Sequence, residues 1–121
     1  MNGITLALIF VGGGIGSVLR YLIGLPFKMG TVSLPIGTLL ANISAAIIIA
    51  ITFALANKSN ISPRTLFFLT TGLCGGLSTF STFSFETVQL FQQQQFGWAV
   101  INICITNIAC IGLIAGISTF K

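Results

Sequence analysis

Charged side chains are almost missing from this chain of 121 residues. It has one acidic residue, Glu86, five lysines and arginines and no histidine, so charged residues make up 5% of the chain. Soluble domains average about 25% charged residues, and so few charges do not cover the surface of a soluble protein. Because 55% of the residues are hydrophobic, we expect lipid to be the solvent and predict an all-α membrane protein without a soluble domain.

The same absences exclude several functions. One carboxylate and no histidine leave few groups for acid–base chemistry, so the chain is not expected to be an enzyme. The three cysteines lack the spacing of metal ligands and are interpreted as small packing residues. No phosphate-binding loop is present to drive active pumping. The cations stand singly, at Arg20, Lys28, Lys58, Arg64 and Lys121. Without a basic run, no nucleic-acid partner is expected.

Four apolar stretches are long enough to cross a bilayer, which takes about 20 helical residues. We expect spanning helices at residues 4–25, 34–56, 65–91 and 98–120, in a single transmembrane domain over residues 1–121. The first stretch lacks the basic region of a cleaved signal and is interpreted as a true span. The connections are short, which predicts that consecutive helices are antiparallel neighbours.

The positive charges are nearly balanced across the membrane. Four spans place Lys58, Arg64 and Lys121 on one side, against Arg20 and Lys28 near the other. Since an excess of Lys and Arg normally sets the orientation, this chain can insert both ways round. Two opposed copies would then form an antiparallel, dual-topology homodimer with its twofold axis in the membrane plane.

The first helix carries small residues and a cation on one stripe. Gly12, Gly16, Arg20 and Gly24 follow one another at intervals of four, and small residues at this spacing let another helix approach closely. A cation inside the membrane is costly. Arg20 therefore either reaches the interface with its long side chain or faces a water-filled cavity, where it would concentrate anions.

Amides occur in the second and fourth helices. Asn42 lies near the middle of its span, where it needs a hydrogen-bond partner. It either bonds another helix or offers an N–H donor to a polar path. In the fourth helix Asn102, Thr106 and Cys110 share one face and Asn107 is expected to point elsewhere. Thr106 is the best candidate there for a polar path, with packing between helices as the alternative.

The third span is interrupted by glycines and hydroxyl residues. Gly72, Gly75 and Gly76 precede a run of serines and threonines. Because glycine and threonine are poor helix formers, we expect a break near residues 75–79, buried or lining a cavity. Its free carbonyls would suit a small cation. An unbroken helix that uses these residues for close packing is the alternative.

After the break, helical spacing sorts the side chains onto two faces. Phe80 and Phe83 share one face. The roughly opposite face carries hydroxyl and carboxyl groups, from Ser78, Thr82 and Glu86, with Ser81 beside them. Ring edges carry positive potential, so ring edges and hydroxyl donors together can contact an anion without trapping it. Glu86 lies either in a wet vestibule or in a structural role at the interface.

Three segments resemble the CrcB/Fluc family of fluoride channels. They are GGGIGSVLRY (residues 12–21), PIGTLLAN (residues 35–42) and GLCGGLSTFSTFS (residues 72–84). They occur in the family's order, the likeness covers nearly the whole chain, and the third segment is the most specific. The resemblance implies a passive, multi-pass fluoride channel in the bacterial plasma (inner) membrane, in contact with lipid. It also implies an antiparallel homodimer with two pores, each lined by both subunits.

The resemblance also implies a role for each candidate residue. The pathway residues would be Asn42, Phe80, Phe83, Ser81, Thr82, Glu86 and Thr106, with Arg20 matching the family arginine of the first helix. Backbone carbonyls of Gly75 and Ser78 would hold a structural sodium ion at the dimer centre. Ser78 stands where the family commonly has threonine, which is harmless to a site made of carbonyls. The fourth helix matches loosely, so Thr106 is the weakest of these assignments.

Alternative functions fit this sequence less well. A small dual-topology antiporter for drugs or cations needs a carboxylate deep in the bundle, whereas Glu86 comes late in the third helix. An accessory subunit of a larger complex would leave the polar faces unexplained. Some family members pair two different subunits, but Asn42, Phe80 and Phe83 are all present here, which favours a homodimer.

Overall fold

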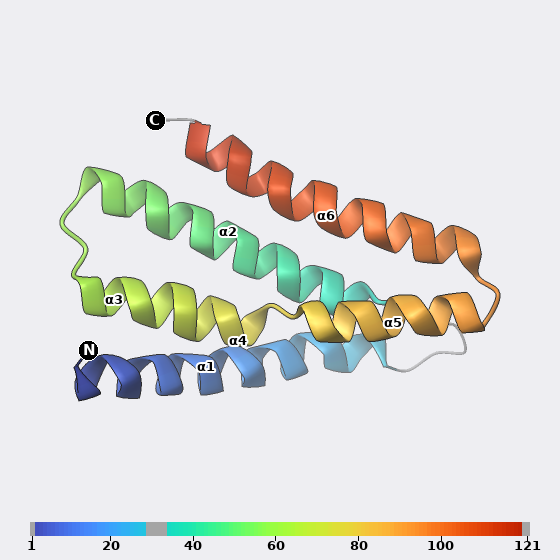
Figure 1. Cartoon of the computed structure of the whole chain (residues 1–121), viewed down its shortest axis with the longest axis horizontal. Coiled ribbons are helices and arrows are strands. Elements are labelled where there is room, and N and C mark those ends of the chain that lie inside the picture. Colours follow the sequence, from blue (N-terminus) through green and yellow to red (C-terminus); the bar gives the residue numbers. More distant parts are fainter. Residues whose placement is uncertain (1, 29–33, 120–121) are drawn as a thin grey trace.

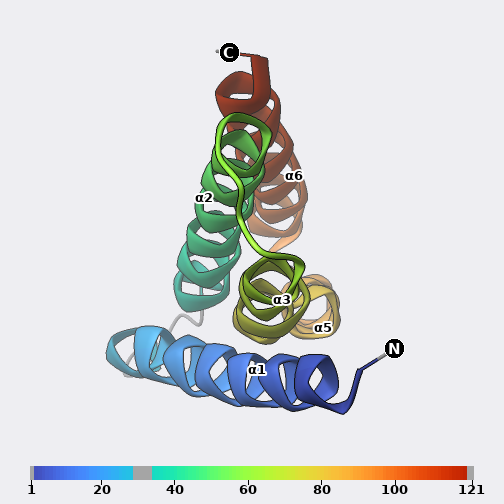
Figure 2. The same cartoon turned by 90° about the vertical axis from the view of Figure 1, so that its left-hand side faces the viewer.

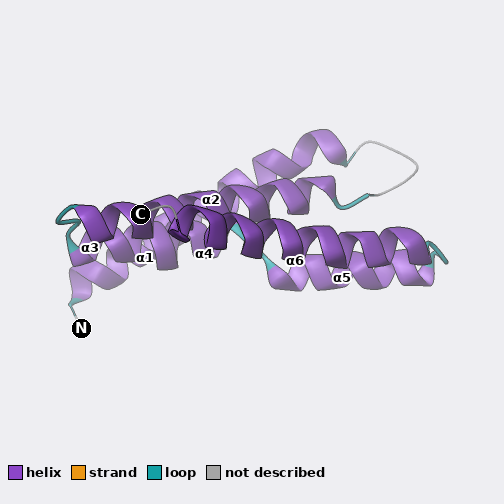
Figure 3. Ribbon diagram, turned by 90° about the horizontal axis from the view of Figure 1, so that it is seen from above, coloured by secondary structure: helices purple, strands orange, loops and turns teal. Residues whose placement is uncertain are grey.

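The computed structural model describes residues 2–28 and 34–119, which form helices joined by short connections (Figures 1 and 3). The elements are α1 (Gly3–Gly24), the 3-10 turn η1 (Leu25–Phe27), α2 (Ile36–Lys58), α3 (Pro63–Phe67), the π-helical segment η2 (Phe68–Cys74), α4 (Gly75–Leu77), α5 (Phe80–Gln92) and α6 (Phe96–Thr119). The expected end of the last span, Phe120, lies outside the described residues.

Four stretches of these elements are long and apolar enough to cross a membrane. They are Gly3–Phe27, Ile36–Lys58, Pro63–Gln92 and Phe96–Ser118. The third contains α3, η2, α4 and α5, which together form one bent rod. The predicted all-helical class, with four membrane-length helices and an interrupted third, is therefore confirmed.

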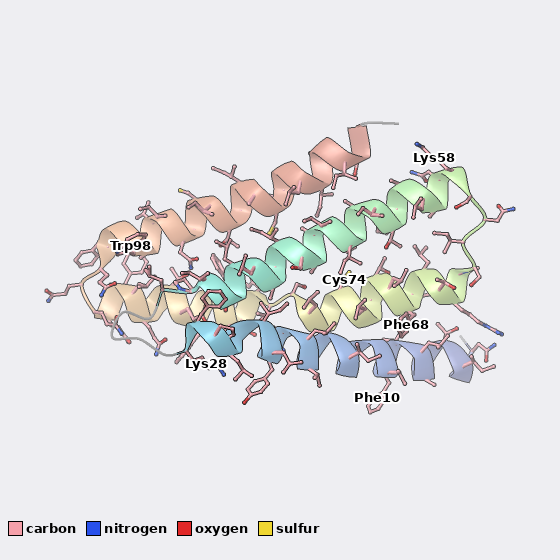
Figure 4. All side chains as sticks on the ribbon, turned by 180° about the vertical axis from the view of Figure 1, so that it is seen from behind. Phe10, Lys28, Lys58, Phe68, Cys74 and Trp98 are labelled. Carbon is pink, nitrogen blue, oxygen red and sulfur yellow. The ribbon has the colours of Figure 1, made fainter. Side chains whose placement is uncertain are left out.

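The bent rod lies at the centre of the structure. Seen end-on, α1 lies on one side of it, and α2 and α6 lie on the other (Figure 2). α1 packs along η2 and α4, while α2 packs along α6 and η2. Lys28 and Lys58 lie at opposite ends of the bundle (Figure 4), so each end carries positive charge.

The contact between α1 and the rod is a contact of backbones. Gly12 and Gly16 are the buried residues of α1. A Cβ placed on Gly16 would meet the Leu73 carbonyl oxygen, and would come within 2.7 Å of the Leu77 nitrogen. A Cβ on Gly76 would likewise meet the α1 backbone. The close approach that the glycine stripe predicted is confirmed.

The break in the rod occurs at Ser78 and Thr79, shortly after Gly76. Ser78 (φ −80°, ψ 157°) and Thr79 (φ −154°, ψ 123°) are extended, whereas Gly75 and Gly76 remain helical in α4. The break thus falls within the expected residues 75–79, but glycine is not what leaves the helix. Hydroxyl side chains offer the backbone alternative hydrogen bonds, and Thr79 caps α5 by accepting a bond from the Thr82 nitrogen.

We expect alanine at Gly16 or Gly76 to force α1 away from the rod. The added methyl group has no room beside the facing backbone, and overpacking of this kind costs about 1–3 kcal/mol. The thermal unfolding midpoint of the purified protein in detergent should fall for both variants. Gly14→Ala is the matched control, because a Cβ at Gly14 meets no described atom within 4 Å. Equal midpoints for Gly14→Ala and Gly16→Ala would contradict the packing.

Candidate functional site

Asn42 holds the break in place from the neighbouring helix. Its Nδ2 donates to the Thr79 carbonyl oxygen at 3.2 Å, and its Oδ1 accepts from the Thr79 nitrogen at 2.7 Å. The side chain is buried, with 9% of its surface exposed. Of the two roles expected for Asn42, the bond between helices is therefore present. A carboxamide has two N–H groups, so the second N–H of Asn42 takes no part in these two bonds.

The same bonds change the surroundings of two backbone carbonyls. In a continuous helix the Thr79 and Thr82 nitrogens would donate to the Gly75 and Ser78 oxygens, four residues earlier. Here Thr79 donates to Asn42, and the Thr82 nitrogen donates to Thr79 Oγ1 at 3.1 Å. The carbonyls of Gly75 and Ser78, which the resemblance assigns to sodium, thus lose their usual helical donors.

A cavity of about 350 Å³ opens on one side of the break, between α2, the bent rod and α6. We call it the phenylalanine cavity. It is lined by Asn42, Ala45, Ala46, Ile49, Thr70, Cys74, Gly75, Ser78, Thr79, Phe80, Phe83, Thr106, Asn107, Cys110, Ile111 and Ile114. The Phe80 and Phe83 ring centroids are 5.7 Å apart, with the planes tilted by 41°. Phe83 is buried, at 7% exposed, but Phe80 is 78% exposed in the single chain.

A second cavity, of about 370 Å³, lies where α1 and α2 meet α5, and it is much more polar. We call it the polar vestibule. It is lined by Ser17, Arg20, Tyr21, Gly24, Phe27, Lys28, Leu34, Pro35, Gly37, Thr38, Thr82, Glu86 and Gln89. Two cations and one acid thus share its wall. The Lys28 ammonium lies 4.6 Å from the centre of the Tyr21 ring, a cation–π distance.

Some polar groups of the vestibule are hydrogen-bonded to one another, and others have no partner. Arg20 Nη1 lies 3.5 Å from Thr82 Oγ1, and Thr38 Oγ1 donates to Glu86 Oε1 at 2.9 Å. Arg20 Nε and Glu86 Oε2 are buried without a partner among the described residues. Unpaired polar atoms at membrane depth require water or a ligand. Arg20 therefore borders the polar vestibule with one buried nitrogen unpaired among the described residues.

A short chain of hydroxyl groups joins the two cavities. Thr79 lines the phenylalanine cavity and Thr82 lines the vestibule. Thr79 Oγ1 donates to Thr82 Oγ1 at 3.1 Å, and Ser81 Oγ lies 3.3 Å from Thr79 Oγ1. Ser81 itself is exposed and is not among the described residues that line either cavity.

One placement expected from helical spacing is wrong. Ser78 was expected on the face of Thr82 and Glu86, but it lines the phenylalanine cavity. The two extended residues shift the helical phase, so spacing counted across them has no meaning. Asn107 was expected to point away from the face of Thr106; it is exposed whereas Thr106 is buried, and both nevertheless border the phenylalanine cavity. The cavity is wide enough to include adjacent residues of one helix.

Thr106 has surroundings of two kinds. It lines the phenylalanine cavity, and it also belongs to a chain of bonds between α6 and α5. Thr106 Oγ1 lies 3.4 Å from Asn102 Oδ1, and Asn102 Nδ2 donates to Thr87 Oγ1 at 3.0 Å. Thr87 in turn donates to the Phe83 carbonyl oxygen at 2.7 Å.

Sequence reasoning missed Thr38 and Thr79 as site residues. Thr38 precedes Asn42 by one helical turn, so the same face of α2 carries both, and this spacing was a usable signal. Thr79 had a signal as well, because a threonine before a helical run is a typical N-cap. Its backbone bonds to Asn42, in contrast, join residues 37 positions apart and leave no local pattern.

The family model described as CrcB-like protein, Camphor Resistance (CrcB), matches residues 7–117. The chain belongs to this family. The matched residues include every residue that lines the two cavities. With its four membrane-length helices, the chain is a multi-pass membrane protein.

Named relatives are similar over most of their length. Proteins called fluoride-specific ion channel FluC from Salmonella arizonae, Salmonella paratyphi B and Salmonella newport are each 44% identical to this chain over 108 residues. The aligned part covers 88% of this chain and 85% of each relative. The similarity is therefore not confined to one motif.

We expect Asn42→Ala to destabilise the break. The variant leaves the N–H and the carbonyl of Thr79 without their partner, and each unpaired buried group costs about 1–3 kcal/mol. Thr52→Val is the matched control, because the buried Thr52 hydroxyl donates only within its own helix, to the Ile48 oxygen. The unfolding midpoint in detergent should fall much further for Asn42→Ala. A larger fall for Thr52→Val would contradict this role of Asn42.

Proposed function

We propose that this chain is a passive fluoride channel of the cell membrane, through which the cell sheds fluoride. The observation that carries the proposal is the pairing of a phenylalanine-lined cavity with a polar vestibule on either side of the helix break. Membership of the CrcB-like family, and 44% identity to proteins named fluoride-specific ion channels, support the same conclusion.

The chemistry of the two cavities suits a small, strongly hydrated anion. A selective pore has to replace the ion's water with close donors and still release the ion. Ring edges and neutral donors attract an anion weakly. The fixed cations Arg20 and Lys28 line the vestibule, where they concentrate anions at the entrance. The ion therefore meets full positive charge before the narrow part of its path and not within it.

Each pathway residue has a proposed task on this route. Asn42 offers its remaining N–H, and Phe80 and Phe83 offer ring edges in the phenylalanine cavity. Thr82 and Glu86 belong to the polar track that leads from the vestibule, and Thr106 faces the track from α6. Ser81 joins it through Thr79 Oγ1.

A second copy of the chain completes the pore. In the single chain the Phe80 ring is 78% exposed and lies next to extended backbone at Ser78 and Thr79. Irregular backbone at membrane depth has to be covered by protein or to line a water-filled cavity. An antiparallel copy supplies that cover. The positive charges at both ends of the bundle, including Lys28 and Lys58 (Figure 4), are compatible with insertion in both orientations.

Sodium fits the centre of this dimer. The carbonyls of Gly75 and Ser78 have lost their helical donors to Asn42 and Thr79, and unwound backbone carbonyls are typical ligands of sodium in membrane proteins. Two antiparallel copies would contribute the same pair of carbonyls across the twofold axis. The ion would stabilise the dimer and would not be transported.

Purified protein in liposomes loaded with fluoride or chloride should release fluoride and retain chloride, as followed with ion-selective electrodes. Fluoride release should need neither an energy source nor a counter-transported ion. Fluoride retained at the level of empty liposomes, or chloride released as fast as fluoride, would overturn the proposed function.

We expect Phe80→Ile and Phe83→Ile to slow fluoride release while the dimer still assembles. Isoleucine fills similar space but lacks the positive ring edge, and a lost stabilisation of about 1.4 kcal/mol corresponds to about a tenfold slower rate. Phe10→Ile is the matched control, since Phe10 is 82% exposed on α1 and points away from the other helices (Figure 4). Wild-type rates in both test variants would remove the rings from the mechanism.

Removal of sodium should weaken the dimer. In buffer with a large organic cation in place of sodium, we expect a lower unfolding midpoint and less cross-linked dimer in detergent, both restored when sodium is added back. The physical reason is that an ion bound only to the assembled form stabilises that form. Potassium at the same ionic strength is the control. The same midpoint in all three buffers would argue against a structural sodium ion.

A further inference from the structure

The phenylalanine cavity has few hydrogen-bond donors that are not already in use. Six of its lining side chains carry an O–H or N–H group that can donate, namely Asn42, Thr70, Ser78, Thr79, Thr106 and Asn107. A hydroxyl has one proton to donate, whereas a carboxamide has two N–H groups. An anion in this cavity can use only donors that remain after the internal bonds of the protein.

Two of the hydroxyls donate to their own helical segment. Thr70 Oγ1 donates to the Leu66 carbonyl oxygen, and Ser78 Oγ donates to the Cys74 carbonyl oxygen, both at 2.8 Å. Each bond spans four residues, as is common for serine and threonine in helices at membrane depth. Neither hydroxyl has a second proton for an ion.

The other two hydroxyls donate to neighbouring side chains. Thr79 Oγ1 donates to Thr82 Oγ1 at 3.1 Å, in the direction of the vestibule. Thr106 Oγ1 donates to Asn102 Oδ1 at 3.4 Å, in the bond chain between α6 and α5. All four hydroxyl protons of the cavity are therefore directed at protein acceptors.

The two amides each keep one N–H. Asn42 Nδ2 makes one bond, to the Thr79 oxygen, and Asn107 Nδ2 makes one, to the Ile103 carbonyl oxygen at 2.7 Å. The second N–H of each group has no acceptor among the described residues. Asn42 lines the cavity from α2 and Asn107 lines it from α6, so the two donors come from different walls.

The position of Asn107 makes an amide without a partner energetically costly. Asn107 lies close to the middle of α6 and is exposed in the single chain. A carboxamide left against hydrocarbon costs roughly 2–7 kcal/mol in transfer free energy. Polar side chains at this depth normally face other protein or a polar path, and the neighbouring Thr106 is buried on the cavity side of the helix.

We propose that Asn107 is a second amide donor to the anion in the phenylalanine cavity and helps to select fluoride. The proposal rests on the proposed fluoride channel function and adds to it a residue that the family resemblance did not assign. Fluoride, the smaller anion with the more concentrated charge, gains more from a second N–H donor than chloride does. Asn107 therefore contributes to selectivity as well as to rate.

Two substitutions of Asn107 separate the effect of its N–H donors from the effects of side-chain volume and of dimer assembly. Asn107→Leu removes both N–H groups at similar volume. Asn107→Asp keeps the shape and replaces the donors by acceptors. The matched control is Ser44→Ala, because the Ser44 hydroxyl also donates to the carbonyl four residues earlier, on Leu40, at 2.8 Å. Ser44 lies outside the described lining of the phenylalanine cavity.

The measurements are fluoride and chloride release from liposomes, and the fraction of cross-linked dimer, for wild type and all three variants. We expect Asn107→Leu to slow fluoride release about tenfold, Asn107→Asp to slow it further, and Ser44→Ala to match wild type, with the dimer intact in each. The fluoride-to-chloride ratio should fall for both Asn107 variants.

Wild-type fluoride release from Asn107→Leu or Asn107→Asp would overturn the proposal, as would loss of the dimer in step with the rate. Failure of the wild type to release fluoride would instead defeat the proposed function.

Discussion

The structure depends on one reciprocal pair of hydrogen bonds, between the Asn42 carboxamide and the backbone of Thr79. A membrane offers no water to a broken helix, so each freed backbone group needs a partner inside the protein. Asn42 supplies an acceptor and a donor at once. The bent rod can therefore leave the helical conformation at Ser78 and Thr79 and resume it in α5. Without an amide at this position of α2, the break would expose unpaired groups to lipid.

Both cavities follow from this break. Because the chain is extended for two residues, α5 restarts with Phe80 and Phe83 on the phenylalanine cavity and with Thr82 and Glu86 on the polar vestibule. There Thr82 contacts Arg20 of α1, and Glu86 accepts a bond from Thr38 of α2. The same displacement takes the usual donors away from the Gly75 and Ser78 carbonyls. The break that Asn42 stabilises thus separates the aromatic cavity from the polar vestibule, and it leaves a pair of carbonyls without helical donors.

The glycine contact between α1 and the bent rod sets the distance between Arg20 and the α5 side of the vestibule. Backbone contact of α1 with η2 and α4 leaves no space for a side chain at Gly16 or Gly76. One turn further along α1, Arg20 then lies near enough to reach Thr82 Oγ1. A methyl group at Gly16 would therefore affect both the packing and the electrostatics of the vestibule.

The sequence by itself determined the four membrane-length helices, the small-residue contact of α1 and an interruption within residues 75–79, because hydrophobic length and residue type are local properties. It did not determine which residues leave the helix: Gly75 and Gly76 are poor helix formers, but both remain helical in α4, where Gly76 packs against the α1 backbone. Nor did it place Ser78 and Asn107, since helical spacing carries no information across an extended segment or about the width of a cavity. Only the tertiary structure decided these points, because partners such as Asn42 and Thr79 lie far apart in the chain and meet only after the helices pack.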